Sequence, residues 1–229
     1  MQSAMPNLTR LSLHYIVFTG PMTLIDLSGF VHLQDLTLSN FRNDSVPKVP
    51  QSIKHLHLVN NHSMRSVPTQ ESTKLPLLES LSVLHCSKIT SGGLLDMFNM
   101  SGCGLKYLDV GGKLFESNMN VRDAFPASNT VQFLGLSMMA NIKDKELKSI
   151  AELYPNLQRI DLESTSISGV GLKYLVEKGL TSIKVDYCAN LGEDAVVWAR
   201  AQGVTVSHNM IRPQQQQQRY RDVLADRYY

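Results

Sequence analysis

The chain has 229 residues, a length that suits one large domain or two small ones. It carries 22 basic and 20 acidic side chains, and the resulting net charge of +2 argues against a dedicated nucleic-acid-binding protein. Apolar residues make up 43% and charged residues 18% of the chain, as expected of a globular protein rather than a disordered one. Three cysteines are too few for a closed disulfide framework and indicate a reducing compartment.

The sequence shows neither a membrane span nor a secretion signal. Its longest apolar stretches, such as Tyr15–Phe18, are far shorter than the roughly 20 residues that a spanning helix needs. The first ten residues lack a charged segment followed by an apolar one, so they do not resemble a signal peptide. We therefore expect a protein of the cytoplasm or the nucleus that binds neither membranes nor nucleic acids.

Leucine is in excess, and the leucines recur with the spacing L-x-x-L-x-L. In chain order the copies are Leu8-Leu11-Leu13, Leu33-Leu36-Leu38, Ile53-Leu56-Leu58, Leu78-Leu81-Val83, Leu105-Leu108-Val110, Val131-Leu134-Leu136, Leu157-Ile160-Leu162, Leu180-Ile183-Val185 and a weaker Ala201-Val204-Val206. The middle positions are separated by 25, 20, 25, 27, 26, 26, 23 and 21 residues. Self-similarity at this period is typical of solenoid proteins.

The spacing predicts one short strand in each copy. Alternation places the last two apolar residues of a copy on one face of the strand, and one copy alone cannot bury that face. Stacking successive strands in a parallel sheet buries all of these faces in one continuous core. Helical spacing of apolar residues predicts four return helices. The first starts with the segment Ser91–Phe98, and the others cover Lys145–Leu153, Gly171–Glu177 and Glu193–Ala201.

The first half follows a different pattern. Two prolines within residues 46–53 favour an extended return over a helix in the 20-residue copy. Asn61 occupies a turn from which an inward asparagine can bond to neighbouring backbone groups. Residues 14–32 are irregular and show no repeat spacing of their own.

These copies resemble the leucine-rich repeat family. In the second half they resemble its cysteine-containing subtype from F-box proteins, which reads L-x-x-L-x-L-x-x-C-x-x-I-T-D-x-G-L-x-x-L. The stretches Leu78–Leu94 and Ile183–Ala195 match this pattern, and the resemblance covers about residues 8–207. The cysteine position is filled in chain order by Cys86, Met139, Thr165 and Cys188. The resemblance implies an α/β horseshoe with a parallel inner sheet and a helical or irregular convex side.

The same resemblance implies protein recognition, and more narrowly the selection of substrates for an SCF-type ubiquitin ligase. We find no F-box in the chain: Leu75–Glu79 resembles the opening of one, but Leu78 already belongs to a repeat and a strand follows. Binding to the SCF adaptor would therefore require an F-box upstream. Because the chain starts almost inside its first repeat, we expect a truncated product or gene model. The alternative is a free-standing scaffold or regulator without a ligase role.

Candidate reactive residues are better explained by the repeat than by catalysis. Cys86 and Cys188 lie three residues after the last apolar position of a strand, where a small side chain packs at the turn. Cys103 is also expected to pack. His55 and His57 share one strand face, which His14 from an earlier copy is expected to join. Asp35 is on the adjacent strand, but no set of ligands at metal-binding spacing accompanies the histidines.

No catalytic sequence pattern is present, and the carboxylates do not suggest acid catalysis. Asp109, Asp161 and Glu163 fall on solvent-facing strand positions, where they lack the burial that raises the pKa of a catalytic acid. We therefore predict that the protein is not an enzyme and needs no cofactor or metal. An enzyme or metal protein built on these repeats remains the least favoured alternative.

The strand positions between the apolar residues predict a binding surface on the concave face. Tyr107 and Phe133 fall on neighbouring strands with Gly111 and Gly135 beside them, an arrangement that suits an aromatic hot spot receiving a partner side chain. Acidic residues outnumber basic ones nearby, which favours a partner segment with basic residues. The predicted partner-binding residues are Tyr107, Asp109, Phe133, Arg159, Asp161, Glu163, Lys184 and Asp186.

The sequence divides the chain into a solenoid of about 8–9 repeats over residues 1–211 and a tail over residues 212–229. The tail contains five consecutive glutamines, a low-complexity run that need not fold. Its last segment is predicted either to be disordered or to form a short helix that caps the open end of the solenoid.

Overall fold

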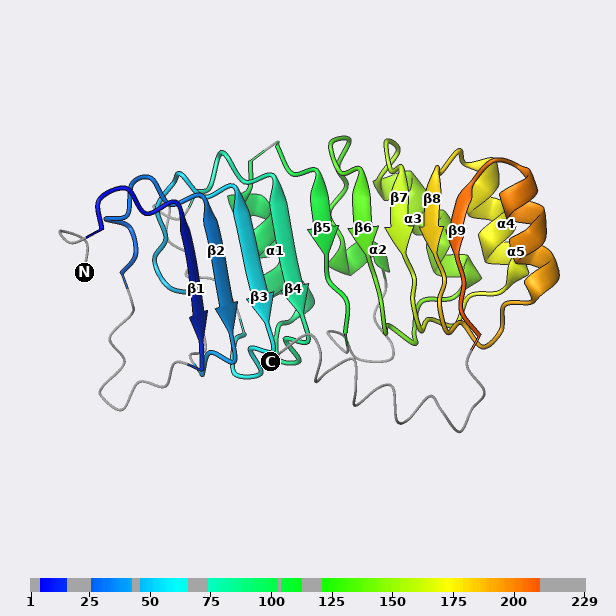
Figure 1. Ribbon diagram of the computed structural model, residues 1–229, viewed down its shortest axis with the longest axis horizontal. Coiled ribbons are helices and arrows are strands. Elements are labelled where there is room, and N and C mark those ends of the chain that lie inside the picture. Colours follow the sequence, from blue (N-terminus) through cyan, green and yellow to red (C-terminus); the bar gives the residue numbers. More distant parts are fainter. Residues whose placement is uncertain are drawn as a thin grey trace.

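The structure is a computed structural model that describes residues 5–15, 26–42, 46–65, 74–102, 104–112 and 121–210. Within them, nine strands form one parallel sheet in which the strands follow one another in sequence order (Figure 1). The strands are β1 Arg10–His14, β2 Asp35–Ser39, β3 His55–Val59, β4 Ser80–Leu84, β5 Tyr107–Asp109, β6 Phe133–Gly135, β7 Arg159–Asp161, β8 Ser182–Lys184 and β9 Thr205–Ser207. The predicted parallel sheet is confirmed. Cys103 and the predicted tail lie outside the described residues.

The register of eight strands agrees with the predicted apolar spacing. Leu36 of β2, for example, pairs with Leu11 of β1 and with Leu56 of β3. The ninth copy was predicted two residues too early, because Val206 pairs with Ile183 of β8, whereas the predicted spacing aligned it with Val185. The reason is a turn after the preceding helix, with Gly203 in the left-handed region at φ +85°, which delays the start of β9.

Five helices lie on one side of the sheet in the described part of the chain (Figure 1). They are α1 Ser91–Met100, α2 Val121–Ala124, α3 Asp144–Leu153, α4 Gly169–Glu177 and α5 Glu193–Ala201. Four of them begin within two residues of the predicted positions, and the short α2 was not predicted. The fold is therefore α/β and solenoid-like, with sheet and helices as two layers. None of the described helices has the length and apolar composition that crossing a bilayer requires.

The core lies between the sheet and the returning segments. In the second half, helices supply its outer layer, as Leu147 and Ile150 of α3 do. Between β2 and β3 the described return contains no helix, and Val46, Val49 and Ile53 fill the same layer from an extended segment. This matches the extended return that the prolines predict.

Eight of the nine strands are followed by a left-handed residue at the same position, two residues after the last apolar residue of the L-x-x-L-x-L copy. The positions are Tyr15, Asn40, Asn60, His85, Gly112, Met138, Ser164 and Tyr187. Each of their backbone N–H groups donates a hydrogen bond to the next strand's end, as Asn40 does to the carbonyl of Val59 at 3.0 Å. The left-handed turn thus extends the sheet's hydrogen bonding beyond the strands and fixes the lower edge of the sheet in Figure 1.

The next residue after each left-handed one is buried wherever it is described. This buried turn position holds Phe41, Asn61, Cys86, Met139, Thr165 and Cys188. The predicted inward asparagine is confirmed: the Oδ1 atom of Asn61 accepts from the N–H of Phe41 at 2.8 Å, and its Nδ2 donates to the carbonyl of Leu38 at 2.9 Å. Burial raises the pKa of the Cys86 thiol to about 12, as expected of a packing residue and not of a nucleophile.

Candidate functional site

The candidate site lies on the sheet face opposite the helices, which we call the open face. It is formed by the first, third and fifth positions of the strands, because alternate residues of a strand point to opposite faces. On eight of the strands, the residues at these positions are the ones that the sequence predicts for this face. Polar and aromatic side chains can therefore gather on this face without disturbing the core.

Three side chains from neighbouring strands stack on one another near the middle of this face. The rings of Tyr107 and Phe133 are parallel to within 3°, with centroids 4.2 Å apart. The guanidinium of Arg159 lies over the other side of Phe133, 5.7 Å from the ring centroid. Tyr107 and Phe133 are half-buried and Arg159 is exposed. We call these three residues the aromatic stack.

The glycines beside the stack do not leave the open floor that the sequence predicts. A Cβ atom on Gly135 would meet Oδ1 of Asp109 at 2.2 Å, so the side chain of Asp109 already fills this space. At Gly111 the hydroxyl of Ser137 occupies the equivalent space. Asp109 also accepts a hydrogen bond from the hydroxyl of Tyr107 at 3.4 Å. A partner therefore meets a filled surface around the stack and not a pocket beside it.

Three charged side chains lie together next to the stack. The ammonium group of Lys184 is 3.1 Å from Oδ2 of Asp161 and also contacts the carboxylate of Glu163. Burial alone would lower the pKa of Lys184, but the hydrogen bond that Lys184 donates to Glu163 and the charge of Asp161 outweigh it, so the pKa is raised. These three residues, which we call the charged cluster, carry a net charge of −1.

Asp186 does not belong to the exposed surface, so its predicted placement is wrong. It is only 4% exposed. Its two carboxylate oxygens accept hydrogen bonds from the hydroxyl of Ser207 and the side-chain amide of Asn209, at 2.9 and 2.8 Å. Its role is to attach the end of β9 to β8.

The histidines of the first strands lie on the same face but at a distance in sequence from the stack. The Nε2 atom of His55 is 3.9 Å from Oδ1 of Asp35. Burial, together with the charge of His55, lowers the pKa of His57. Across the described ranges, no three histidine, cysteine, aspartate or glutamate side chains are grouped closely enough to hold a metal ion.

No protein family and no curated protein matches the chain. A solved structure is similar: a protein from Bacteroides fragilis aligns with a TM-score of 0.51 and 16% sequence identity. The alignment covers 90% of this chain and 66% of that protein, so the chain spans just under two thirds of its length. At this identity the similarity shows the fold alone. It agrees with the solenoid-like α/β arrangement described above.

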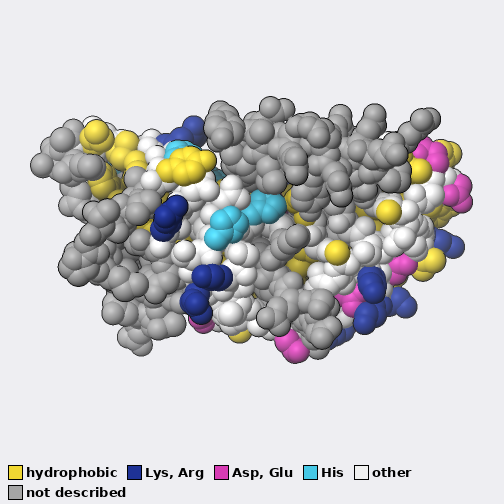
Figure 2. Space-filling view, turned by 90° about the horizontal axis from the view of Figure 1, so that it is seen from below, with side chains coloured by type: hydrophobic (Ala, Val, Ile, Leu, Met, Phe, Trp, Pro, Cys, Tyr) yellow, Lys and Arg dark blue, Asp and Glu magenta, His cyan; other side chains and the backbone are white. Residues whose placement is uncertain are grey.

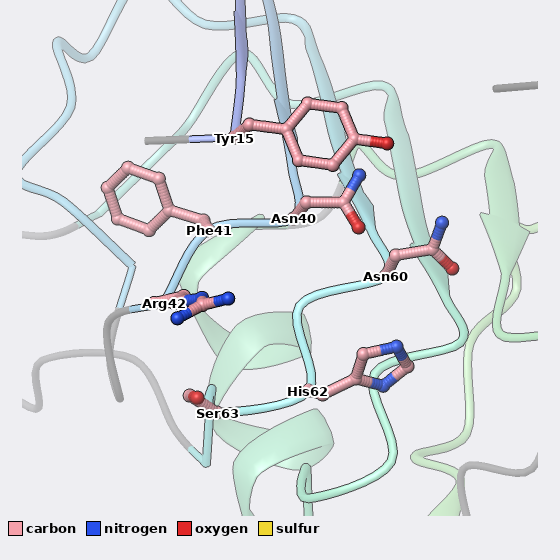
Figure 3. Close-up of a pocket in the computed structure, with 7 residues that line it drawn as sticks. All are labelled: Tyr15, Asn40, Phe41, Arg42, Asn60, His62 and Ser63. Atoms are coloured by element: carbon pink, nitrogen blue, oxygen red, sulfur yellow. The ribbon is translucent and has the colours of Figure 1, made fainter. Parts of the chain in front are cut away.

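One hollow was not predicted from the sequence. It lies where β1, β2 and β3 end, has a volume of about 430 Å³, and is shown in Figure 3. Its lining residues are Tyr15, Asn40, Phe41, Arg42, Asn60, His62 and Ser63, and we call it the strand-end pocket. The available signal was Asn40 and Asn60, because asparagine tolerates the left-handed conformation better than most residues.

Proposed function

We propose that the protein recognises another protein through the open face, without catalysis, and that the aromatic stack is the centre of the contact. The single observation that carries this proposal is the stack itself: two parallel rings and a guanidinium on three neighbouring strands, placed away from the core. Tyrosine and arginine are enriched at the residues that dominate binding energy, and aromatic residues are enriched in interfaces generally.

The surroundings of the stack support this role. The charged cluster beside it has a net charge of −1, and Asp109 adds a further carboxylate next to Tyr107. A partner segment with basic residues gains from this field mainly in its rate of association and its specificity. The half-buried rings can bury further area when a partner covers them, which is the larger source of affinity.

The test is a comparison of partner capture by three forms of the protein. The variant Tyr107→Ala/Phe133→Ala removes the stack, and Trp198→Ala removes an exposed aromatic side chain from α5 as the matched control. Proteins retained by the wild type and the control, but lost with the double variant, are the expected partners. Their affinity should fall by about 2 kcal/mol or more. Equal recovery by all three forms contradicts the proposal.

We further propose that the strand and return units are leucine-rich repeats arranged as a horseshoe, of the cysteine-containing subtype in the second half. The regular L-x-x-L-x-L spacing and the buried turn position support this. The resemblance to F-box proteins extends the proposal to substrate selection for an SCF-type ubiquitin ligase in the cytoplasm or nucleus.

The ligase role has its own test. The protein is expressed with any F-box that the upstream coding sequence supplies, and its co-purification with the SCF adaptor is measured. Co-purification supports a ligase role. Its failure contradicts that role and favours the alternative, a free-standing scaffold or regulator that uses the same open face.

A further inference from the structure

The strand-end pocket is built on a rigid edge. Asn40 and Asn60 are left-handed, with φ of 53° and 56°, and their backbone N–H groups donate to the carbonyls of Val59 and Leu84. Because the sheet's own hydrogen bonding fixes the backbone here, the points from which the two side chains extend along the rim of the hollow are fixed. In Figure 3 they lie in one line with Tyr15, at three successive strand ends.

The walls of the pocket are also tied to each other. Asn61 lies beneath them, fully buried, and its amide bonds to the backbone of both Leu38 and Phe41. The turn after β3 therefore cannot shift relative to the turn after β2 without breaking buried hydrogen bonds. Preorganisation of this kind lowers the cost of ordering a binding site when a ligand arrives.

The lining residues supply hydrogen-bond donors and positive charge. Arg42 is exposed and forms no ion pair with another described residue, while His62, Ser63 and the two asparagine amides add further donors. None of the seven lining residues is acidic. The hydroxyl of Ser87 lies 3.4 Å from Nδ1 of His62 and orients its ring.

The sheet edge around the pocket also carries basic side chains. Figure 2, seen from below, shows this edge: Lys, Arg and His side chains with few acidic neighbours lie over its left half, under the first strands, while at its right end Lys and Arg side chains alternate with acidic ones. Arg65 and Lys88 follow β3 and β4 at this edge. An anion approaching the pocket therefore meets a favourable field before it makes contact.

We propose that the strand-end pocket binds an oxyanion carried by a protein segment, a phosphoserine phosphate or a glutamate carboxylate. Both groups accept several hydrogen bonds and pair with a guanidinium, which is the chemistry that Arg42 and the amides offer. The volume of about 430 Å³ lies within the range of ligand sites and accommodates the anion with the residue that carries it. The site is separate from the aromatic stack, so it does not depend on the function proposed above.

The experiment uses three short peptides, identical except for a central phosphoserine, glutamate or serine. Each is titrated into the isotope-labelled full-length chain, and the NMR signals of the Asn40 and Asn60 side-chain amides and of the His62 ring are followed. The variant Arg42→Gln removes the cation of the pocket. The matched control Arg10→Gln removes an exposed arginine from the opposite end of β1.

We expect saturable binding of at least one anionic peptide, shifts centred on these three residues, and no binding of the serine peptide. Arg42→Gln should weaken binding about tenfold or more, because charge-assisted hydrogen bonds are about twice as strong as neutral ones. Arg10→Gln should leave it unchanged. A tighter phosphoserine complex identifies phosphate as the source of the anion, and equal affinities identify either group as sufficient. No binding of either anion, or equal losses with Arg42→Gln and Arg10→Gln, overturns the proposal.

Discussion

The first four strands and the last five build the same sheet in different ways. β1 to β4 have five residues each, and the described segments that join them contain no helix. From β5 onward the strands have three residues each, and a helix precedes every one of them. The register is nevertheless continuous from β1 to β9. The difference teaches that the strands and their closing turns keep one register even where the path of the return changes.

The two regions close their turns with different chemistry at the buried turn position. In the first region Asn61 bonds to two backbone groups of the preceding turn. In the second region Thr165 donates to the carbonyl of Leu162 at 2.7 Å, and the Cys188 thiol donates to the same carbonyl at 3.1 Å. In the first region the Asn61 side chain therefore forms two buried hydrogen bonds to the backbone, whereas Thr165 and Cys188 in the second region each form one. The helices of the second region bury additional apolar area.

The largest expected effect concerns the two thiols at this position, one at the end of the first region and one in the second. Burial raises the pKa of both Cys86 and Cys188, to about 12 for Cys86, against an ordinary value of 9.0. In a Cys103→Ser background, alkylation of native Cys86 at pH 8 should be about a thousandfold slower than in the unfolded chain, because the reactive thiolate is that much rarer.

The pH dependence has a definite sign. Because the folded pKa of Cys86 is raised, its contribution to stability is complete below pH 9 and is lost as pH rises from 9 toward 12. Mass spectrometry of quenched samples measures the alkylation rate, and urea titrations at several pH values measure the stability. Labelling of either native thiol as fast as a free cysteine would mean that its turn is open.

Next in size is the variant Asn61→Ala. It leaves the N–H of Phe41 and the carbonyl of Leu38 without their present buried partner, and each such group costs about 1–3 kcal/mol. We expect a loss of about 3 kcal/mol in the free energy of unfolding. Thr165→Ala, at the same position in the second region, should cost about 1 kcal/mol. Urea unfolding followed by circular dichroism compares them, and equal losses would remove the distinction between the two regions.

The strands could be predicted from the sequence because their information is local. Two apolar residues in or directly after each strand, such as Leu134 and Leu136, repeat at a regular spacing along the chain. The ninth strand was misplaced because its start depends on how α5 ends, at Gln202 and Gly203, and not on apolar spacing.

The site was predicted less completely, because its details depend on contacts between strands. Aligning equivalent positions of successive strands was enough to predict that Tyr107 and Phe133 are neighbours. The sequence did not show that the side chain of Asp109 covers Gly135. It also did not show that Asn209, which follows β9, donates a hydrogen bond to the carboxylate of Asp186. Such contacts depend on which rotamer each side chain adopts, and the spacing of residues carries no information about that.

Gly135→Ala should have a smaller effect than Asn61→Ala, and it tests how tightly the second region packs its open face. The added Cβ would lie 2.2 Å from Oδ1 and 2.5 Å from Cγ of Asp109, so the carboxylate must move. Overpacking of this kind costs about 2 kcal/mol. Gly104→Ala is the matched control, since its Cβ would have 3.7 Å to its nearest neighbour, the carbonyl oxygen of Leu78. Equal unfolding midpoints for both variants would show that Asp109 relaxes freely.

The smallest effect has the opposite sign and sharpens the contrast with Asn61. Tyr154, at the end of α3 in the second region, is 1% exposed, and its hydroxyl has no hydrogen-bond partner among the described residues. A buried polar group that lacks a partner destabilises the fold, so Tyr154→Phe should increase the free energy of unfolding by about 1 kcal/mol. A measured loss of stability would show that the hydroxyl is bonded in solution.

This variant also has a pH signature. Burial raises the pKa of Tyr154, so the folded chain keeps the hydroxyl neutral while the unfolded chain ionises it above about pH 10. Wild-type stability therefore falls in that range through Tyr154, and the phenylalanine variant lacks this contribution. The advantage of the variant should grow between pH 9 and pH 11, because every other titrating group is common to both proteins. A constant difference across this range would place Tyr154 in contact with solvent, and its hydroxyl would then impose no penalty on the second region.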